Sequence, residues 1–207
     1  MDKAVIDQFW RQRSATGAGR WTESPMLNFE RELLAPMVGA NCRILDLGSG
    51  SAELSRKLLL DTTHLLAVDK YPGFLEDIPD DPRVIKQCAD LESFATASTF
   101  DLILLFGVVT HLEADEEESI YEKARNWLAP AGTMVVKNQI SRGVELLMDG
   151  FSDALQCHYV ARYPALDVQE GLLKSRFNTV RIVAYPDTFN RWPTTMHTAF
   201  VCSEPYY

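Results

Sequence analysis

Residues 43–52 read RILDLGSGSA, and this stretch decides the fold. The short apolar run up to Leu47 predicts a buried strand. Gly48 and Gly50 then allow a tight turn, because a residue without a Cβ atom adopts backbone conformations that other residues avoid. Residues 52–60 follow with helical periodicity. The stretch therefore predicts a strand, a turn and a helix, the unit from which parallel sheets are built.

Apolar runs and helical patterns continue to alternate on both sides of this turn. Further strands are expected at 65–68, 84–87, 100–106 and 133–137, and helices at 4–13, 26–37, 116–128 and 168–176. The run 100–106 is the most continuous apolar segment and is expected at the centre of the sheet. Residues 179–184 and 198–202 are expected to pair as an antiparallel hairpin, whereas 139–166 match no regular pattern. The predicted fold class is α/β, a Rossmann-like, doubly wound, seven-stranded mixed sheet with its last strand antiparallel.

Composition excludes several classes of protein. The chain of 207 residues carries 20 Lys and Arg against 29 Asp and Glu, a net charge of -9. Duplex nucleic acid is not an expected partner, because binding it requires clustered positive charge. No apolar stretch approaches the roughly 20 residues of a membrane helix, and the first residues lack the order of a signal peptide. We therefore expect a cytoplasmic protein with no membrane partner, and the oligomeric state stays open.

The cysteines and the acidic run show no pattern of a metal site. Cys42, Cys88, Cys157 and Cys202 are scattered without a CxxC pair, so buried free thiols are expected. The acids of residues 113–118 are interpreted as the solvated first turn of a helix, because consecutive acids on a helix point in different directions. No metal is expected.

Two carboxylates flank the glycine turn. Asp46 lies two residues before the first glycine, where it can face a positively charged ligand group. Asp69 ends the second predicted strand, where a carboxylate can accept hydrogen bonds from the two hydroxyls of a ribose. The third glycine of a dinucleotide fingerprint is absent, because Glu53 stands in its place. These residues favour a nucleoside that carries an ammonium over a nicotinamide dinucleotide.

The turn resembles the motif D-x-G-x-G-x-A/G of class I S-adenosylmethionine-dependent methyltransferases, and the resemblance covers about residues 40–140. It implies that S-adenosylmethionine is the cofactor. By position it implies these cofactor-binding residues: Asp46, Gly48, Ser49, Gly50, Asp69, Lys70, Asp90, Leu91, Phe106 and Gly107. In this interpretation Asp90 meets the adenine amino group and Phe106 lines the methyl-donor pocket. The alternatives are a helix cap for Asp90 and plain core for Phe106.

The length suits a single methyltransferase domain over residues 1–207. Within it we expect a helical lid at 1–40, a cofactor-binding core at 41–138, and an acceptor-side insertion with the C-terminal hairpin at 139–207. Residues 9–13, with Arg20 and Trp21, resemble the variable lid that such enzymes fold over the donor. The alternative is an amphipathic helix anchored in the core by its aromatic residues.

The need for a catalytic base distinguishes the possible methyl acceptors. A sugar hydroxyl needs its proton removed, whereas an amine or carboxylate needs only the right ionisation state. His111, in the loop after the run 100–106, is the first candidate for a catalytic base, and His197 is the second. The alternative for His111 is a structural partner at the start of a helix.

The segment 185–197, YPDTFNRWPTTMH, is rich in aromatic and hydrogen-bonding residues, as a sugar-binding loop would be. Arg191 or Arg142 is a candidate partner for a phosphate or carboxylate. The alternative is a packed loop that covers the end of the sheet. The predicted function is transfer of a methyl group to an oxygen of a small polar acceptor, such as a sugar or sugar phosphate of a polysaccharide or secondary-metabolite pathway. The alternatives are an N- or carboxyl-methyltransferase acting on a small molecule, and a non-catalytic nucleoside-binding partner subunit.

Overall fold

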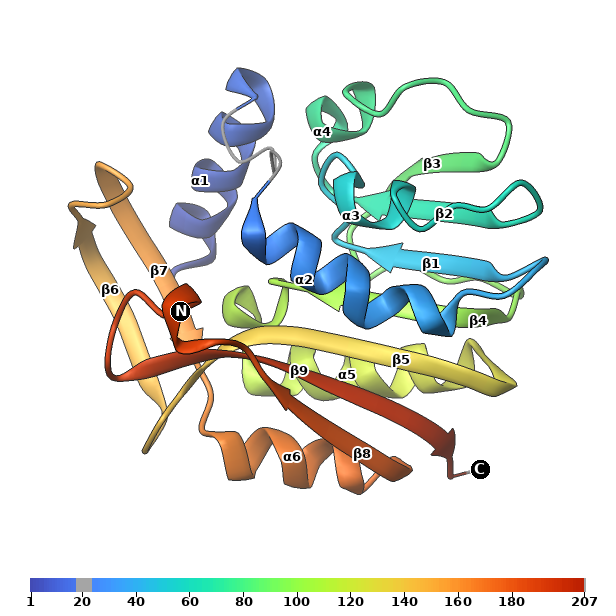
Figure 1. Ribbon diagram of the computed structural model, residues 1–207. Coiled ribbons are helices and arrows are strands. Elements are labelled where there is room, and N and C mark those ends of the chain that lie inside the picture. The colour runs from blue at the N-terminus through green and yellow to red at the C-terminus, as the bar shows by residue number, and fades with distance from the viewer. Residues whose placement is uncertain (18–23, 207) are drawn as a thin grey trace.

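A seven-stranded sheet forms the centre of the molecule (Figure 1). The computed structural model describes residues 1–17 and 24–206. The strands are β1 (Arg43–Leu47), β2 (His64–Asp69), β3 (Val84–Cys88), β4 (Phe100–Phe106), β5 (Leu128–Ser141), β8 (Phe177–Ala184) and β9 (Thr195–Pro205). Their order is β3-β2-β1-β4-β5-β9-β8. The first five pair in parallel, and β9 is antiparallel to both of its neighbours. The predicted mixed sheet with an antiparallel last strand is confirmed, as is the central position of β4.

Helices cover both faces of the sheet. They are α1 (Lys3–Thr16), α2 (Pro25–Leu34), α3 (Glu53–Arg56), α4 (Pro72–Glu76), α5 (Ala114–Asn126) and α6 (Leu166–Lys174), with 3-10 turns η1 (Ala35–Met37), η2 (Val109–His111) and η3 (Asp187–Phe189). Successive residues of β1 point to opposite faces of the sheet. Leu45 lies in the core that includes Tyr121 of α5, and Ile44 lies in the core that includes Leu34 of α2. Among the described residues, no helix has the length and apolar character needed to cross a membrane.

The first crossover helix is shorter than predicted. A helix was expected at 52–60, but α3 ends at Arg56. The chain continues in tighter i to i+3 turns, with the amide of Leu58 donating to the carbonyl of Ser55 at 3.1 Å and that of Leu59 to Arg56 at 3.3 Å. Periodicity alone does not distinguish these turns from an α-helix, because both place every third or fourth residue on the same face.

Residues 139–166, which match no regular pattern in the sequence, extend the sheet and add a hairpin. Strand β5 runs on to Ser141, and β6 (Leu146–Ser152) pairs with β7 (Cys157–Tyr163) in a separate two-stranded sheet. This hairpin stands beside α1, at the edge of the molecule (Figure 1). Phe151 of β6 is 62% exposed, so burial leaves only a weak signal in the sequence.

A buried ion pair attaches the hairpin to the main sheet. Arg162 of β7 donates to the carboxylate of Glu117 on α5, and both side chains are buried. Glu117 also accepts hydrogen bonds from Tyr121 and from Gln169 of α6, each at 2.9 Å. Arg162 in turn donates to the carbonyl of Leu112 at 3.1 Å. The ion pair therefore joins α5, α6, β7 and the loop after η2.

Two expectations about polar residues were wrong in part. The acids of 113–118 were expected in a solvated turn, yet Glu117 faces the core because Arg162 and Tyr121 satisfy its carboxylate there. Four buried thiols were expected, yet Cys88 is exposed and Cys157 is partly exposed. Both lie at the periphery, Cys88 on the edge strand β3 and Cys157 on the hairpin.

We expect Glu117→Gln to lower the free energy of unfolding by about 1 to 3 kcal/mol, because it removes the buried carboxylate partner of Arg162 and leaves only the exposed Glu145, at 2.9 Å. The matched control is Glu118→Gln, one residue further along α5, where the acid is exposed and a change within about 0.5 kcal/mol is expected. Urea unfolding of both variants measures the difference. Equal stability of the two variants would contradict the role of this pair.

Candidate active site

The glycine turn closes against β2 and against the loop after β4. The amides of Gly48 and Ser49 donate to the carbonyl of Val68 at 2.8 and 3.0 Å. Gly48 has a φ of 70°, and a Cβ atom on it would lie 2.4 Å from a methyl group of Val108. Gly50 has a φ of 54° with open space around it. Gly48 therefore satisfies both a backbone and a packing requirement, and Gly50 a backbone requirement.

Asp69 joins the ends of β1 and β2. Its carboxylate accepts hydrogen bonds from the amide of Gly50 at 2.8 Å and from the amide of Tyr71 at 2.9 Å. Burial raises the pKa of Asp69, and these amides act in the opposite direction. The carboxylate thus both holds the turn in place and borders the cavity beside it.

Asp46 is the second buried acid beside the turn. The hydroxyl of Ser55 on α3 donates to its carboxylate at 2.6 Å. Burial raises the pKa of Asp46 to about 7; the Ser55 hydrogen bond opposes this, and the nearby charge of Asp69 adds to it. A carboxyl group that titrates near neutral pH at the wall of a cavity is typical of a functional site.

Lys70 links the end of β2 to α1. Its ammonium lies 2.9 Å from a carboxylate oxygen of Asp90 and 3.5 Å from one of Asp7. Burial opposes ionisation of Asp90, but the amide of Glu92 and the Lys70 ammonium outweigh it and lower the pKa of Asp90. Asp90 also begins the turn that follows β3: its carboxylate accepts from the amide of Glu92 at 3.0 Å and its carbonyl accepts from the amide of Phe94 at 2.8 Å. The alternative interpretation as a helix cap is wrong, because the three residues after it form a turn and no helix begins there.

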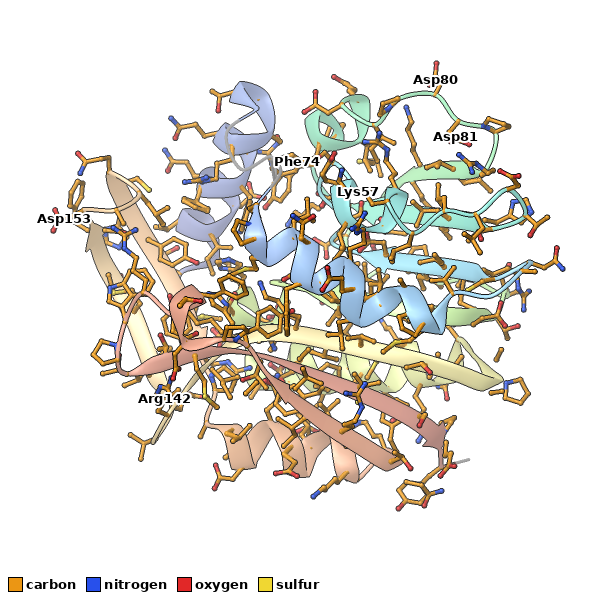
Figure 2. All side chains as sticks on the ribbon, in the orientation of Figure 1. Lys57, Phe74, Asp80, Asp81, Arg142 and Asp153 are labelled. Carbon is orange, nitrogen blue, oxygen red and sulfur yellow. The ribbon has the colours of Figure 1, made fainter. Side chains whose placement is uncertain are left out.

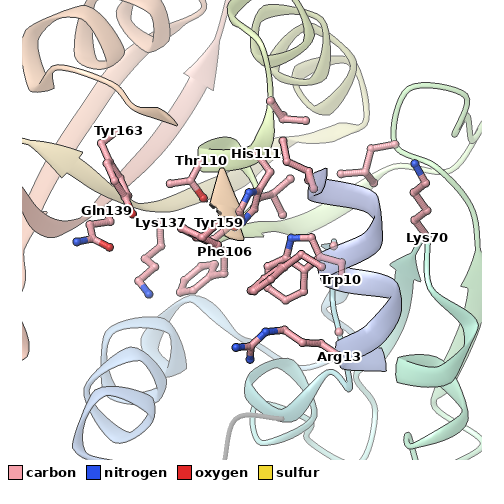
Figure 3. A pocket seen from close by; sticks show the side chains of 18 of the residues that line it. Trp10, Arg13, Lys70, Phe106, Thr110, His111, Lys137, Gln139, Tyr159 and Tyr163 are labelled. Atoms are coloured by element: carbon pink, nitrogen blue, oxygen red, sulfur yellow. Dashed lines mark hydrogen bonds between the residues drawn. The ribbon is translucent and has the colours of Figure 1, made fainter. Parts of the chain in front are cut away.

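One cavity of about 1480 Å³ brings the predicted residues together. It is lined by every residue proposed for the cofactor and by His111: Asp46, Gly48, Ser49, Gly50, Asp69, Lys70, Asp90, Leu91, Phe106, Gly107 and His111. Helix α1 borders the same cavity through Phe9, Trp10 and Arg13 (Figure 3). The cavity lies at the carboxyl ends of the parallel strands, the usual ligand site of open α/β sheets. Arg20 and Trp21 lie outside the described residues.

His111 lies on η2 between two aromatic rings. Its ring centroid is 5.3 Å from that of Trp10 and 5.7 Å from that of Tyr159, both in edge-on arrangements. Its Nδ1 lies 3.3 Å from the carbonyl of Val160 and donates a hydrogen bond to it. Burial lowers the pKa of His111 to about 4, so the imidazole is neutral at pH 7. A neutral ring with Nδ1–H committed leaves Nε2 as the proton-accepting atom.

One part of the segment 185–197 packs against α2, and another part lines the cavity. Tyr185 and Phe189 pack against Phe29 of α2, with ring centroids 4.7 and 6.0 Å away, as the packed-loop alternative expected. Arg142, labelled in Figure 2, pairs with Asp187 at 2.7 Å and does not line the cavity. The residues of the segment that line the cavity are Arg191, Trp192, Thr194, Thr195 and His197.

Two parts of the cavity wall were not predicted. Tyr159 and Tyr163 enter from β7, in the stretch that had no assignment. Lys137, at the polar end of an apolar strand, pairs with Glu30 of α2 at 3.3 Å, and both side chains are buried. A polar residue that ends a buried parallel strand is a signal for a site, because ligands bind at that edge of the sheet. The acid on α2 leaves no comparable signal.

Comparison with known proteins agrees with this geometry. Residues 44–132 match the family model described as a methyltransferase domain, and no curated protein matches the chain. Among solved structures, the 1,6-didemethyltoxoflavin-N1-methyltransferase of Burkholderia thailandensis, with 1,6-didemethyltoxoflavin and S-adenosylhomocysteine bound, is similar with a TM-score of 0.75 and 18% identity over 99% of this chain and 88% of its own.

Two further structures show the same fold. Coclaurine N-methyltransferase, bound to N-methylheliamine and S-adenosylhomocysteine, has a TM-score of 0.73 and 12% identity over 88% of this chain and 74% of its own. The N-methyltransferase NodS from Bradyrhizobium japonicum WM9, in complex with S-adenosylhomocysteine, has a TM-score of 0.67 and 16% identity over 96% of this chain and 98% of its own. At these identities the likeness is one of fold.

The mixed sheet, the glycine turn and the matched stretch agree with one another. Residues 44–132 match a methyltransferase domain, and the chain has the fold of methyltransferases whose structures contain S-adenosylhomocysteine. The residues present fit S-adenosylmethionine as a cofactor: a Cβ on Gly48 would collide with Val108, and the buried carboxylates of Asp46 and Asp69 line the same cavity as the turn.

We expect Gly48→Ala to weaken binding of S-adenosylhomocysteine at least 10-fold, because the added Cβ strains the positive φ and displaces Val108. Gly39→Ala is the matched control, since nothing lies within 4 Å of a Cβ there and its φ is ordinary. Isothermal calorimetry with the two folded variants measures the effect. Unchanged affinity in Gly48→Ala would contradict the cofactor site at this turn.

Proposed function

We propose that the protein methylates a small acceptor with an aromatic or heterocyclic ring, and that His111 takes the proton released by the attacking atom. The observation that carries the proposal is the placement of a neutral imidazole in an aromatic wall of the cavity that also contains the glycine turn. S-adenosylmethionine, when bound, supplies an already activated methyl group. The chain's own residues therefore have to bind, align the acceptor and exclude water.

The cofactor end of the cavity is assigned from its charges. In this proposal Asp46 faces the ammonium of the cofactor, and Asp69 accepts hydrogen bonds from the ribose hydroxyls. Asp90 and Leu91 border the adenine, beside Lys70, and the turn 48–50 receives the methionine end. What supports this is that these residues line one cavity and that Asp69 already holds the backbone of the turn in position. All of these residues lie within 41–138, the proposed cofactor-binding core of the chain.

Asp46 makes cofactor affinity depend on pH. Burial raises its pKa to about 7, so the group is mostly a neutral acid at pH 6 and about half ionised at pH 7. The carboxylate is the form that attracts an ammonium, and an α-amino group with a pKa near 8 stays charged over this range. Affinity for S-adenosylhomocysteine should therefore rise about 5-fold from pH 6 to pH 7.

Calorimetry at the two pH values checks this expectation. Asp46→Asn is the control, because it keeps the size of the side chain and removes its titration. A wild-type affinity that is flat over the range, or an equal rise in Asp46→Asn, would show that another group carries the dependence.

The acceptor end is built by segments on both sides of the core. Trp10 on α1, Tyr159 and Tyr163 on β7 and Phe106 on β4 point into a common space with His111 (Figure 3). Their faces suit a flat ring, since aromatic side chains stack favourably on such rings. In this proposal α1 is the lid and the segment 139–207 supplies the rest of the chamber.

The atom that receives the methyl group is proposed from the similar structures and from His111. The three similar structures described above are those of N-methyltransferases, two of them with 1,6-didemethyltoxoflavin or N-methylheliamine bound, and this supports a nitrogen as the acceptor atom. The nitrogen proposed is a ring N–H, because it has a proton for His111 to take, whereas a free amine attacks without a base. Oxygen is the second candidate, favoured by the availability of His111 Nε2 as a base. Turnover with methyl-labelled (13C) S-adenosylmethionine separates them, because N-methyl and O-methyl carbons differ in chemical shift. Product that carries neither signal, or a donor that binds and is never consumed across a broad panel of ring-containing acceptors, would contradict the proposal.

We expect His111→Gln to reduce kcat about 100-fold while affinity for S-adenosylhomocysteine stays within 2-fold, because the amide cannot accept the proton. His158→Gln is the matched control, since His158 is exposed and pairs with Asp149 on the hairpin. Steady-state kinetics and calorimetry give the two readouts. Full turnover in His111→Gln would remove His111 from the mechanism.

A further inference from the structure

Acidic and basic residues line both ends of the cavity. At the cofactor end these are Asp46, Glu53, Asp69, Asp90 and Glu92, together with Lys70. Lys137, Arg13 and Arg191 line the part bordered by α1, β5 and the segment 185–197, which is the acceptor chamber. An anionic acceptor in this chamber would meet these three cations.

Lys137 is the most deeply placed of these cations. Its strand position is opposite Phe106, the residue that borders the chamber at the end of β4. The side chain is 5% exposed, its ammonium is 3.3 Å from Glu30, and Figure 3 shows it reaching toward α2. Glu30 has a second donor, because the hydroxyl of Tyr185 lies 3.2 Å from the same carboxylate oxygen. Glu30 therefore keeps a hydrogen-bonding partner when Lys137 turns toward a ligand.

An ion pair buried at a cavity wall needs an explanation beyond packing. Taking two charges out of water offsets most of their attraction, and apolar residues of similar volume serve the fold as well or better. Glu30 and Lys137 attach α2 to the sheet, but the neighbouring apolar core of this face already does so. A cation that recognises an anionic ligand accounts for the pair, because only a charge provides that selectivity.

Polar residues beside Lys137 can offer further hydrogen bonds to a ligand. His197 and Gln139 are partners in the β5–β9 register and line the cavity with Lys137. Nδ1 of His197 is buried and has no hydrogen-bond partner among the described residues. Burial and the Lys137 charge lower the pKa of His197 to about 4, so the ring is neutral at pH 7. It can donate one hydrogen bond to an oxygen held by Lys137.

Few acids oppose an anion at this end. Glu116 pairs with Lys3, and Asp115 is exposed on the first turn of α5. Asp153 lies at the far tip of the β6–β7 hairpin (Figure 2). Glu30 itself is held by Tyr185 as described. The acids that border the chamber thus either have a cationic partner or lie at its rim.

We propose that Lys137, with His197, forms an acceptor subsite for the carboxylate of an aromatic acid whose ring packs against Phe106, Tyr159 and Tyr163. The subsite rests on the proposed function only in that the acceptor occupies this chamber. The substrate class is thereby narrowed to small aromatic or heterocyclic acids.

The test compares an acid with its neutral amide at constant shape. We use 4-aminobenzoate and 4-aminobenzamide as probes and measure their binding to the protein saturated with S-adenosylhomocysteine. Wild type should bind the acid at least 10-fold more tightly than the amide. Lys137→Met should reduce that ratio to about 1 while the affinity for S-adenosylhomocysteine stays within 2-fold. Lys86→Met, on the edge strand β3, is the matched control and should keep the wild-type ratio.

Glu30→Gln should change the ratio of the two affinities in the opposite direction. Removing the competing carboxylate makes Lys137 more available, so the preference for the acid should increase at least 2-fold. A purely structural ion pair predicts that both variants lose thermal stability and that neither changes the ratio. Glu30→Gln decides the matter by itself where Lys137→Met fails to fold.

Three results would overturn the subsite. The first is that wild type binds both probes equally, or binds neither detectably. The second is an unchanged ratio of the two affinities in Lys137→Met. The third is a 10-fold loss of affinity for S-adenosylhomocysteine in Lys137→Met, which would assign Lys137 to the cofactor. The probes are scored by binding without turnover. A failure here is therefore distinct from a failure of the methyl-transfer proposal, which the His111 variants and the labelled product test.

Discussion

The hydrogen bond between the Gly50 amide and the Asp69 carboxylate is the constraint on which the rest of the site depends. It joins the ends of two parallel strands, and the positive φ of Gly48 and Gly50 lets the chain turn beneath it. A side chain at Gly48 would collide with Val108, so the same turn also sets how closely the loop after β4 can approach. The cofactor end of the cavity is therefore defined by backbone geometry, with Asp46 and Asp69 carried into place by the strands that precede them.

The acceptor end depends on contacts made by segments distant in sequence. Arg162 and Glu117 attach the hairpin β6–β7 to α5, and the carbonyl of Val160 on that hairpin accepts from His111. The position of the candidate base is thus coupled to a buried ion pair two residues further along the same strand, whose Arg162 also donates to the carbonyl of Leu112. Helix α1 completes the enclosure, because Trp10 contacts His111 and Asp7 contacts Lys70.

Much of the core could be predicted because its signals are local. A buried parallel strand is a short apolar run, and residues at its carboxyl end lie where ligands bind. Asp69, Asp90 and Phe106 could therefore be expected at that edge of the sheet. The helix at 52–60 was predicted too long because 3-10 turns share its periodicity. The hairpin within 139–166 was missed because β6 has no buried residue and the buried residues of β7 include the charged Arg162, so neither strand reads as an apolar run. Glu117 was misplaced because its partner, Arg162, is 45 residues away.

The sequence by itself determined the parallel strands of the sheet and the glycine turn, because each depends on neighbours within a few positions of the chain. The residues proposed for the cofactor came from the resemblance of that turn to a family motif. Only the tertiary structure decided which polar side chains face the acceptor. Lys137, Glu30, His197 and Tyr159 come from three strands and a helix, and no local pattern relates them. Their meeting depends on strand register and on how α2 and the hairpin pack against the sheet, and those are properties of the folded chain.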